Sequence, residues 1–324
     1  MANLFESDPR FGALIPPEVQ TEIIESAVKE SVVLSRFKRL ANMTSRQVVL
    51  NVRSVLPMVG AVDGYDEPNS APTTRTFMKP VTDQKFDPRN IYAGEFAAVK
   101  IFRNADLSDA LAAGNDIIRG DIPLFSSQFG AAIDTAVYWG RGKPPEWATI
   151  DSLWRRANAN NAIVTRTNDI YGDIFGTDGV RDKILLTGYM PTGFTSALNM
   201  MGILDGLRDV QGRPIFVDTL RNEYPYALRG IPLGFSENGA WDVERALMMM
   251  ADFSKLVYSV REDITWKIDT SGTYTDQRTG EVHYCGQQNK TALVMHMRMG
   301  WNILDPVTQL SKNPLPFAFL APGN

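Results

Sequence analysis

The sequence predicts an α+β fold in which part of the chain extends away from its own body, and three patterns support this prediction. An amphipathic segment that opens with Pro16 and Pro17 is followed directly by an alternating, strand-like segment. A polar stretch rich in Pro and Gly, residues 59–88, then separates it from a second strand-like segment. Apolar residues next recur every three or four positions over residues 118–137, a spacing typical of one long helix.

Composition indicates a folded protein and excludes several functional classes. Hydrophobic residues make up 44% of the 324 residues and charged residues 22%, as is ordinary for a globular chain. The formal net charge of −4 lacks the basic footprint of sequence-specific nucleic-acid binding. The single cysteine, Cys285, excludes an intrachain disulfide, and the N-terminus lacks the pattern of a signal peptide. No uncharged apolar run reaches the roughly 18 residues of a membrane helix, so we expect no membrane partner.

The first helix is expected to begin at Pro16 or Pro17, because the first N–H groups of a helix have no intrahelical partner and proline lacks that group. Its apolar residues fall on one face and its acidic residues largely on the other. Arg36, Lys38 and Arg39 suit the C-terminal end of the helix dipole. Little nearby in the sequence covers the apolar face, so we expect this helix to act as an arm.

The next segment predicts an extended hairpin. Residues 47–56 alternate as a strand, and strand character returns at residues 90–104. The connection between them, residues 59–88, is far longer than the usual ~4–6 residues. A hairpin of this kind is barely stable alone in water, so we expect it to lie on another surface.

Two helices are predicted after the hairpin. Residues 106–114 form the first, with Ser108 or Asp109 as its cap. The second is the long helix, and Pro123 predicts that it begins near this residue or kinks there. Gly140 is expected to end it.

The second half of the chain predicts shorter, alternating elements. These are a buried strand at 184–186, a helix over 191–207, a helix end, turn and strand over 207–216, a strand entry at 228–233, a strand at 264–268, a strand over 291–302 and a strap at 313–316.

Two motifs resemble metal-binding or catalytic signatures but are incomplete. His283 and Cys285 would share one face of a strand and His296 is a further candidate ligand, whereas a structural zinc site takes four ligands. We therefore interpret His283 and Cys285 as two residues of one strand, with the thiol of Cys285 buried. Ser35 and Lys38 have the Ser-x-x-Lys spacing of some acyl-transfer enzymes but lack the companion motifs.

Other catalytic arrangements have no support in the sequence. Gly142-Lys143 lacks both the spacer and the Ser/Thr of a phosphate-binding loop. The two histidines do not complete a Ser/His/Asp set. The carboxylate pairs Asp66-Glu67 and Glu262-Asp263 are expected in solvated turns. We therefore expect no enzymatic activity, no cofactor and no metal.

The order of these elements resembles the major capsid protein of tailed bacteriophages, which has the Hong Kong 97-type fold. Residues 15–19 look like the opening of the family's N-terminal arm, residues 59–88 like its extended loop, and residues 134–140 like the end of its spine helix. The remaining matches, over roughly residues 12 to 310, are 207–214, 228–232 with 251–254, and 298–302 with 305–306.

The resemblance implies a division of the chain into five parts. These are an N-terminal arm (1–45), an extended β-hairpin loop (46–104, tip about 59–88), a peripheral domain with a long spine helix (105–180), an axial domain (181–260), and peripheral-domain strands with a C-terminal strap (261–324). Because the chain begins shortly before the arm, we expect no fused scaffolding segment unless the N-terminus is already cleaved.

The resemblance also implies a function and partners. The chain is expected to self-assemble, as hexamers and pentamers, into an icosahedral head shell that encloses double-stranded DNA and contacts it without sequence readout. Scaffolding, portal and decoration proteins are possible further partners, and assembly is expected in the host cytoplasm. The alternative is an encapsulin-like nanocompartment shell that encloses cargo enzymes.

Candidate contact residues follow from the same resemblance. Inter-subunit ion pairs of the extended loop are expected to use Arg75, Lys79, Lys85, Arg89, Asp66 and Glu67. Loops around the symmetry axes are expected to contain Asn222, Glu223, Glu237 and Asn238. In members that cross-link covalently a loop lysine reacts, a role open to Lys79 or Lys85. Arg36, Lys38 and Arg39 are the expected contacts with DNA.

Overall fold

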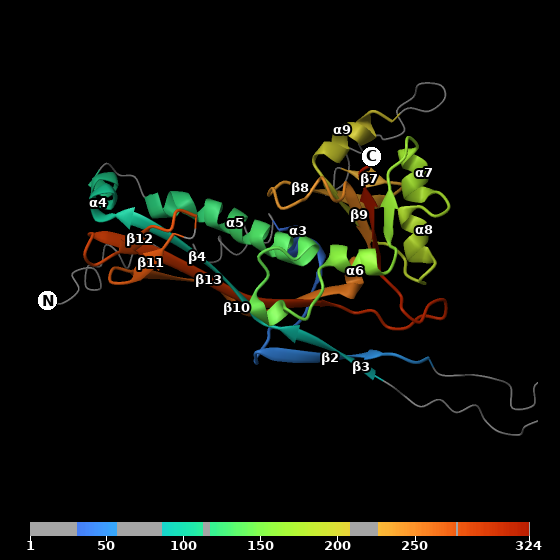
Figure 1. Ribbon diagram of the computed structural model, residues 1–324, viewed down its shortest axis with the longest axis horizontal. Helices are drawn as coiled ribbons and strands as arrows, with labels where there is room; N and C mark the ends of the chain where they lie inside the picture. Colours follow the sequence, from blue (N-terminus) through green and yellow to red (C-terminus); the bar gives the residue numbers. More distant parts are fainter. Residues whose placement is uncertain (1–30, 57–85, 113–116, 208–225, 277, 324) are drawn as a thin grey trace, which may run out of the picture.

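The computed structural model describes residues 31–56, 86–112, 117–207, 226–276 and 278–323. Two sheets organise these residues, a four-stranded sheet accompanied by one long helix and a six-stranded sheet flanked by short helices (Figure 1). Buried residues of both sheets and of the long helix belong to one hydrophobic cluster. The α+β class predicted from the sequence is thus confirmed.

The four-stranded sheet has the order β1-β10-β13-β4. Its strands are β1 (Lys38–Arg39), β10 (Leu256–Asp269), β13 (Lys290–Ile303) and β4 (Gly94–Arg103). The long helix α5 (Ile117–Trp139) lies along this sheet (Figure 1). Every second residue of β13 from Leu293 to Met299 is buried, which confirms the alternation predicted over residues 291–302.

The six-stranded sheet has the order β5-β14-β9-β6-β8-β7. Its strands are β5 (Ile163–Thr165), β14 (Phe317–Ala321), β9 (Met248–Ala251), β6 (Gly193–Ala197), β8 (Ile231–Ser236) and β7 (Ala227–Leu228). All of β6 and β9 is buried, since both strands lie inside the sheet and are covered on both faces. The predicted strand entry at 228–233 is confirmed as the tight turn between β7 and β8, with Arg229 and Gly230 at positive φ.

The other elements are two hairpins and several short helices. The hairpins are β2 (Gln47–Arg53) with β3 (Phe86–Tyr92), and β11 (Thr273–Thr275) with β12 (Val282–Tyr284). The helices are α3 (Val32–Arg36), α4 (Asn104–Ala112), α6 (Leu153–Ala159), α7 (Ile170–Phe175), α8 (Val180–Leu185) and α9 (Asn199–Asp205), with 3₁₀ turns η1 (Pro145–Trp147) and η2 (Phe253–Lys255). Among the described residues no helix is long and apolar enough to span a membrane.

One predicted element in the second half is wrong in type, and a second is right over only part of its length. The expected buried strand at residues 184–186 is the end of helix α8, with Val180 and Ile184 buried one turn apart. A short apolar run cannot by itself distinguish a buried strand from a buried helix. The expected helix over 191–207 is instead strand β6 followed by helix α9, because residues 193–197 pair with β8 and β9.

Smaller corrections concern where two helices begin and where one pair of carboxylates lies. Helix α5 begins at Ile117, so Pro123 lies within its second turn rather than at its start. Helix α4 begins at Asn104, and the Ser108 hydroxyl donates to the Ala105 carbonyl instead of capping the helix. The Glu262-Asp263 pair lies in strand β10 at register shifts, not in a turn.

The six-stranded sheet combines segments that are far apart in the chain. Strand β14, which follows the predicted strap, pairs with β9 and with β5. The five-part division of the chain stays a prediction. Most of the predicted first helix and most of the 207–216 element lie outside the described residues. Within the described part, helix α3 ends at Arg36, and Lys38 and Arg39 lie in strand β1 rather than at the end of the helix.

Candidate assembly surfaces

The β2–β3 hairpin leaves the body with one face covered and the other open (Figure 1). The inner face, with Val48, Leu50 and Ile91, packs on a small hydrophobic cluster that also contains Met43 and Val257. The opposite face is exposed, because alternate strand residues point away from the body. Val49 is 51% exposed and Phe86 is 53% exposed there. The hairpin therefore has an outer face on which Val49 and Phe86 stand exposed among polar side chains, and the described residues do not cover it.

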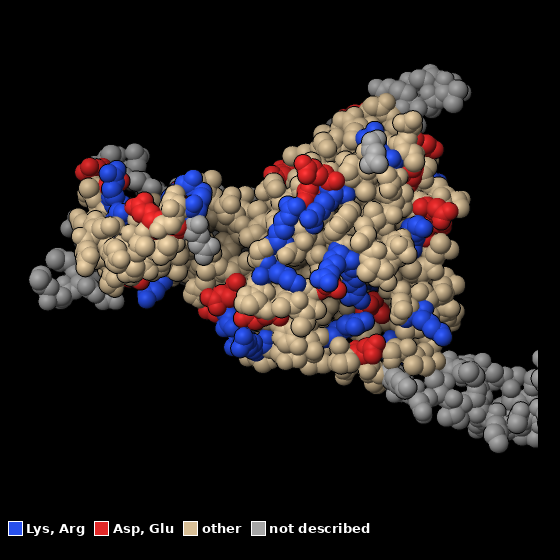
Figure 2. All heavy atoms as spheres, in the orientation of Figure 1, with Lys and Arg blue, Asp and Glu red and all other residues tan. Residues whose placement is uncertain are grey.

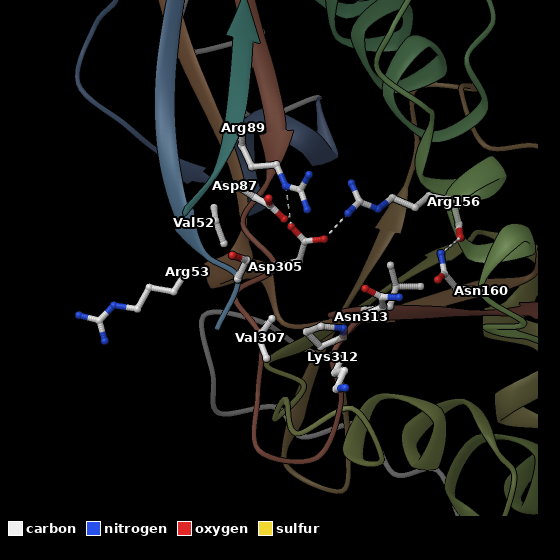
Figure 3. A pocket seen from close by; sticks show the side chains of 13 residues that line it. Val52, Arg53, Asp87, Arg89, Arg156, Asn160, Asp305, Val307, Lys312 and Asn313 are labelled. Carbon is white, nitrogen blue, oxygen red and sulfur yellow. Dashed lines mark hydrogen bonds and ion pairs between the residues drawn. The ribbon is translucent and has the colours of Figure 1, made fainter. Parts of the chain in front are cut away.

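The root of the hairpin is held by a carboxylate between two guanidinium groups. Arg89 of β3 donates from Nε to Oδ1 of Asp305 at 2.9 Å, and Arg156 of α6 donates to Oδ2 of the same residue. Figure 3 shows the two arginines approaching Asp305 from opposite sides. Burial lowers the pKa of Arg156, Asp305 opposes this shift, and Arg89 adds to it. Asp305 thus neutralises two cations that come from separate elements.

This network lines a pocket of about 170 Å³ at the hairpin root. Arg53 and Lys312 also line it, and the guanidinium of Arg53 points away from its centre (Figure 3). No ion pair joins Arg53 or Lys312 to another described residue. The hairpin root therefore presents a polar, cation-rich surface beside the outer face of the hairpin.

A glycine allows the hairpin to cross β13 closely. A Cβ atom on Gly300 would lie 2.5 Å from both Cγ2 of Ile91 and the carbonyl oxygen of Tyr92. That oxygen also accepts from Nε1 of Trp147 at 2.8 Å, so the Tyr92 backbone has little freedom to shift. The hairpin therefore passes so close to β13 that there is no room for a side chain at position 300.

Replacing Gly300 with Ala is expected to lower the free energy of unfolding by about 1–3 kcal/mol, the usual cost of overpacking a well-packed site. Thermal unfolding of the unassembled subunit measures this effect. Gly202→Ala in α9 is the matched control, because nothing lies within 4 Å of its added Cβ. Equal unfolding temperatures for the two variants would contradict the close-crossing interpretation.

A second network joins the beginning of the described chain to α5 and to the loop after β8. The Asp134 carboxylate accepts from the Ser31 hydroxyl at 2.7 Å, from the Val32 and Val33 N–H groups at 2.9 and 3.0 Å, and from the Asn238 amide at 2.7 Å. Burial raises the pKa of Asp134, while these four hydrogen bonds act in the opposite direction. All four partners are placed to donate, a geometry that fits the ionised carboxylate.

The β11–β12 hairpin is a second projection, at the end of the four-stranded sheet where α4 also lies (Figure 1). Its entry turn is organised by Asp269, which accepts from the N–H groups of Ser271 and Gly272 and from the Tyr274 hydroxyl at 2.7 Å. The hydrogen bonds from Ser271 and Tyr274 lower the pKa of Asp269 to about 2.

This turn is expected to stay ordered under mildly acidic conditions. Because the folded pKa of Asp269 lies below its ordinary value of 3.8, its stabilising effect is present above pH 3.8 and is lost only as the pH falls through about 2. The amide resonance of Gly272 should therefore not shift between pH 5 and pH 3, and the Asp269→Asn variant should lack the lower transition. A midpoint near pH 4 would contradict this prediction.

The predicted contact residues have different outcomes. Arg75, Lys79, Lys85, Asp66, Glu67, Asn222 and Glu223 lie outside the described residues. Arg89 is occupied by Asp305 within the same chain, and Asn238 is half-buried against Asp134. Glu237 is exposed. The two intrachain networks thus use two residues that the sequence had suggested for contacts between subunits.

The residues suggested for contact with DNA also have different outcomes. Arg36 is committed inside the subunit, since it donates to the Phe194 carbonyl at 2.9 Å and lies over the Phe253 ring. Its guanidinium also lies directly against Gly234, where a side chain would collide with it. Lys38 and Arg39 are exposed in β1.

The incomplete chemical motifs have structural roles. Cys285 is buried, as predicted, and burial raises the pKa of its thiol. His283 lies 3.0 Å from the Lys290 ammonium, and Ser35 donates to the Val32 carbonyl. Within the described part of the chain no group of three or more His, Cys, Asp or Glu is placed to hold a metal.

Comparisons with known proteins identify the fold. The chain is similar to solved structures from Mycobacterium phage Cain, at 24% identity, TM-score 0.74 and 90% coverage of both chains, and from Mycobacterium phage Bobi, at 25% identity, TM-score 0.73 and 91% coverage of both chains. It is also similar to the capsid of a native GTA particle, at 16% identity, TM-score 0.56, and coverage of 92% of this chain and 90% of that chain. No curated protein matches it significantly. Because the model of the phage capsid family matches residues 12–307, the chain belongs to that family.

Proposed function

We propose that this major capsid protein builds an icosahedral head shell around double-stranded DNA by laying its β2–β3 hairpin across a neighbouring copy. The observation that carries the proposal is the open outer face of the hairpin, with Val49 and Phe86 about half exposed. A two-stranded sheet is marginal alone in water. The hairpin root is fixed to the body, so the hairpin presents this face in a defined direction.

The expected division into functional parts fits this role. The four-stranded sheet with α5 corresponds to the peripheral domain, and the six-stranded sheet corresponds to the axial domain. Glu237, with Asn222 and Glu223, would surround the five- and six-fold axes, where identical copies meet through heterologous, ring-closing contacts. Arg75, Lys79, Lys85, Asp66 and Glu67 would form ion pairs between subunits, each contributing about 0–1 kcal/mol.

Contact with DNA is proposed to be weak and independent of sequence. Of the three suggested cations, Lys38 and Arg39 remain available, because Arg36 is held inside the subunit. Figure 2 shows Lys and Arg interspersed with Asp and Glu on the face it presents. Several cations of the described residues are paired with carboxylates, including Arg141 with Asp242 at 2.9 Å. A mixed surface of this kind lacks the continuous positive stripe of tight DNA binding.

The other functional hypotheses have less support. The family model and the phage structures do not favour a nanocompartment shell. Among the described residues no catalytic arrangement supports an enzymatic role. Ser35 and His283, which belong to the candidate motifs, make structural contacts instead. Scaffolding, portal and decoration proteins remain proposed partners, and host cytoplasm the proposed place of assembly.

Negative-stain electron microscopy of the expressed full chain tests the proposal. We expect closed particles, and we expect the Val49→Ser/Phe86→Ser double variant to remain folded but to form few of them. Val243→Ser, in the turn after β8, is the matched control, because Val243 is also exposed but lies away from the hairpin. A wild-type chain that stays a small, discrete oligomer would refute the shell function. Normal particles from the double variant would refute the role of the hairpin.

A further inference from the structure

Exposed apolar side chains concentrate on two loops away from the outer face of the hairpin. Among the described residues, the most exposed large hydrophobic side chains are Leu310 at 70%, Met190 at 65%, Leu124 at 62% and Leu186 at 60%. Leu124 lies in α5, whereas the other three lie on the loop after α8 and on the loop after β13. We call Leu186, Met190 and Leu310 the Leu310 patch.

Hydrogen bonds fasten the two loops to each other. The Thr308 hydroxyl donates to the Thr187 carbonyl at 2.6 Å, and the Tyr189 hydroxyl donates to the Pro306 carbonyl at 2.8 Å. Tyr189 is buried between its exposed neighbours, so the loop turns one aromatic side chain inward and leaves Met190 outside. These two hydrogen bonds therefore hold the loop after α8 and the loop after β13 side by side.

The turn that carries Leu310 is itself rigid. The Thr308 N–H donates to the Ser311 carbonyl at 3.1 Å, and the Ser311 N–H donates back to the Thr308 hydroxyl at 3.1 Å. These bonds hold Leu310 at the apex of a closed turn. An exposed side chain on a pre-ordered turn loses little conformational entropy on binding, which favours its use as a contact residue.

We propose that the Leu310 patch is a contact surface for a second copy of this chain. The proposal rests on the proposed shell function, which supplies identical copies at high local concentration. Three side chains bury much less than the roughly 1,200–2,000 Å² of a stable stand-alone interface. The patch therefore suits one contact among several around a subunit rather than an independent docking site.

The position of the patch favours a copy of the chain over another partner. The Val307 N–H donates to the Arg53 carbonyl at 3.2 Å, so the loop that carries Leu310 is attached to the hairpin root. A neighbour engaged by the hairpin thus lies beside the patch. Val307 and Lys312, which flank the turn that carries Leu310, also line the cation-rich pocket at the hairpin root.

Thiol protection tests this proposal with the full chain. Leu310→Cys introduces one exposed thiol, while the native Cys285 is 1% exposed and the wild-type chain provides the blank. We expect maleimide to label the unassembled variant rapidly and the purified particles at least about tenfold more slowly. Disassembly of the same particles should restore the fast rate. Equal rates in subunits and particles would overturn the proposal.

Photo-cross-linking then identifies the occupant. A photoreactive phenylalanine analogue in place of Leu310 should give, in particles of this chain alone, a product of twice the 36.0 kDa subunit mass. Particles that give no such product, or a product only with a different added protein, would overturn the proposal and leave the shell function intact. A wild-type chain that forms no particles at all would overturn both.

Discussion

Replacing Asp134 with Ala is expected to lower the free energy of unfolding of the unassembled subunit by at least about 3 kcal/mol. Four donors would lose their acceptor in a site where Asp134 is 1% exposed. A buried donor left without a partner costs about 1–3 kcal/mol. The result would be seen in urea unfolding followed by the fluorescence of Trp139, which lies in the same helix.

The Asp134→Asn variant tests the charge and the geometry separately from size. Asparagine keeps the shape but offers one acceptor oxygen and adds an amide that would face donors. We therefore expect Asn to be nearly as destabilising as Ala. Asp121→Asn is the matched control in the same helix, because Asp121 is also buried but has a single partner among the described residues, Lys100, whose side chain is 45% exposed, so we expect a smaller loss. Similar losses for Asp121→Asn and Asp134→Asn would contradict a special role for Asp134.

This network also explains how the N-terminal region is joined to the body. Ser31 caps helix α3 through the Leu34 N–H and at the same time donates to Asp134. Helix α3 has only 5 residues, and helices of this length are not stable on their own. Its position therefore depends on α5. Loss of Asp134 should impair assembly as well as subunit stability.

Periodic and strongly punctuated elements could be predicted from the sequence. Strand β13 shows a clean two-residue alternation, and the long helix shows a three-to-four-residue spacing that ends at Gly140 with positive φ. The type of short buried elements could not be predicted from the sequence. Residues 184–186 and 193–197 are too short or too uniformly apolar for their period to be read, so tertiary packing decided between helix and strand.

The polar networks were beyond sequence reasoning for a different reason. Asp134 and Asn238 are separated by 104 positions, and Asp305 and Arg89 by 216. No local pattern links residues so distant in the chain. Arg89 and Asn238 are expected at contacts between subunits only because the resemblance assigns them to the extended loop and to an axial loop. Burial of their carboxylate partners was the missing information, and only the fold supplies it.

Replacing Asp305 with Asn is expected to loosen the hairpin root while leaving the sheets intact. Asp305 is the shared partner of Arg89 and Arg156, and its side chain is only 8% exposed. Without its charge, two partly buried guanidinium groups would repel each other with no carboxylate between them. Because both arginines retain some contact with solvent, we expect a stability loss of about 2 kcal/mol, less than the 3–5 kcal/mol of a fully buried pair.

Hydrogen exchange distinguishes loosening of the hairpin from general destabilisation. Amides of β2 and β3 should exchange faster in Asp305→Asn, whereas those in the centre of β10 and β13 should be unchanged, because local openings are confined to the element that lost its anchor. Glu146→Gln is the matched control, since Glu146 pairs at the same root with Arg46, which is largely exposed. Uniformly faster exchange across β13 would instead indicate a global effect. If the hairpin alone loosens, the subunit should fold normally yet assemble poorly, because a hairpin without a fixed direction no longer presents its outer face to a neighbour.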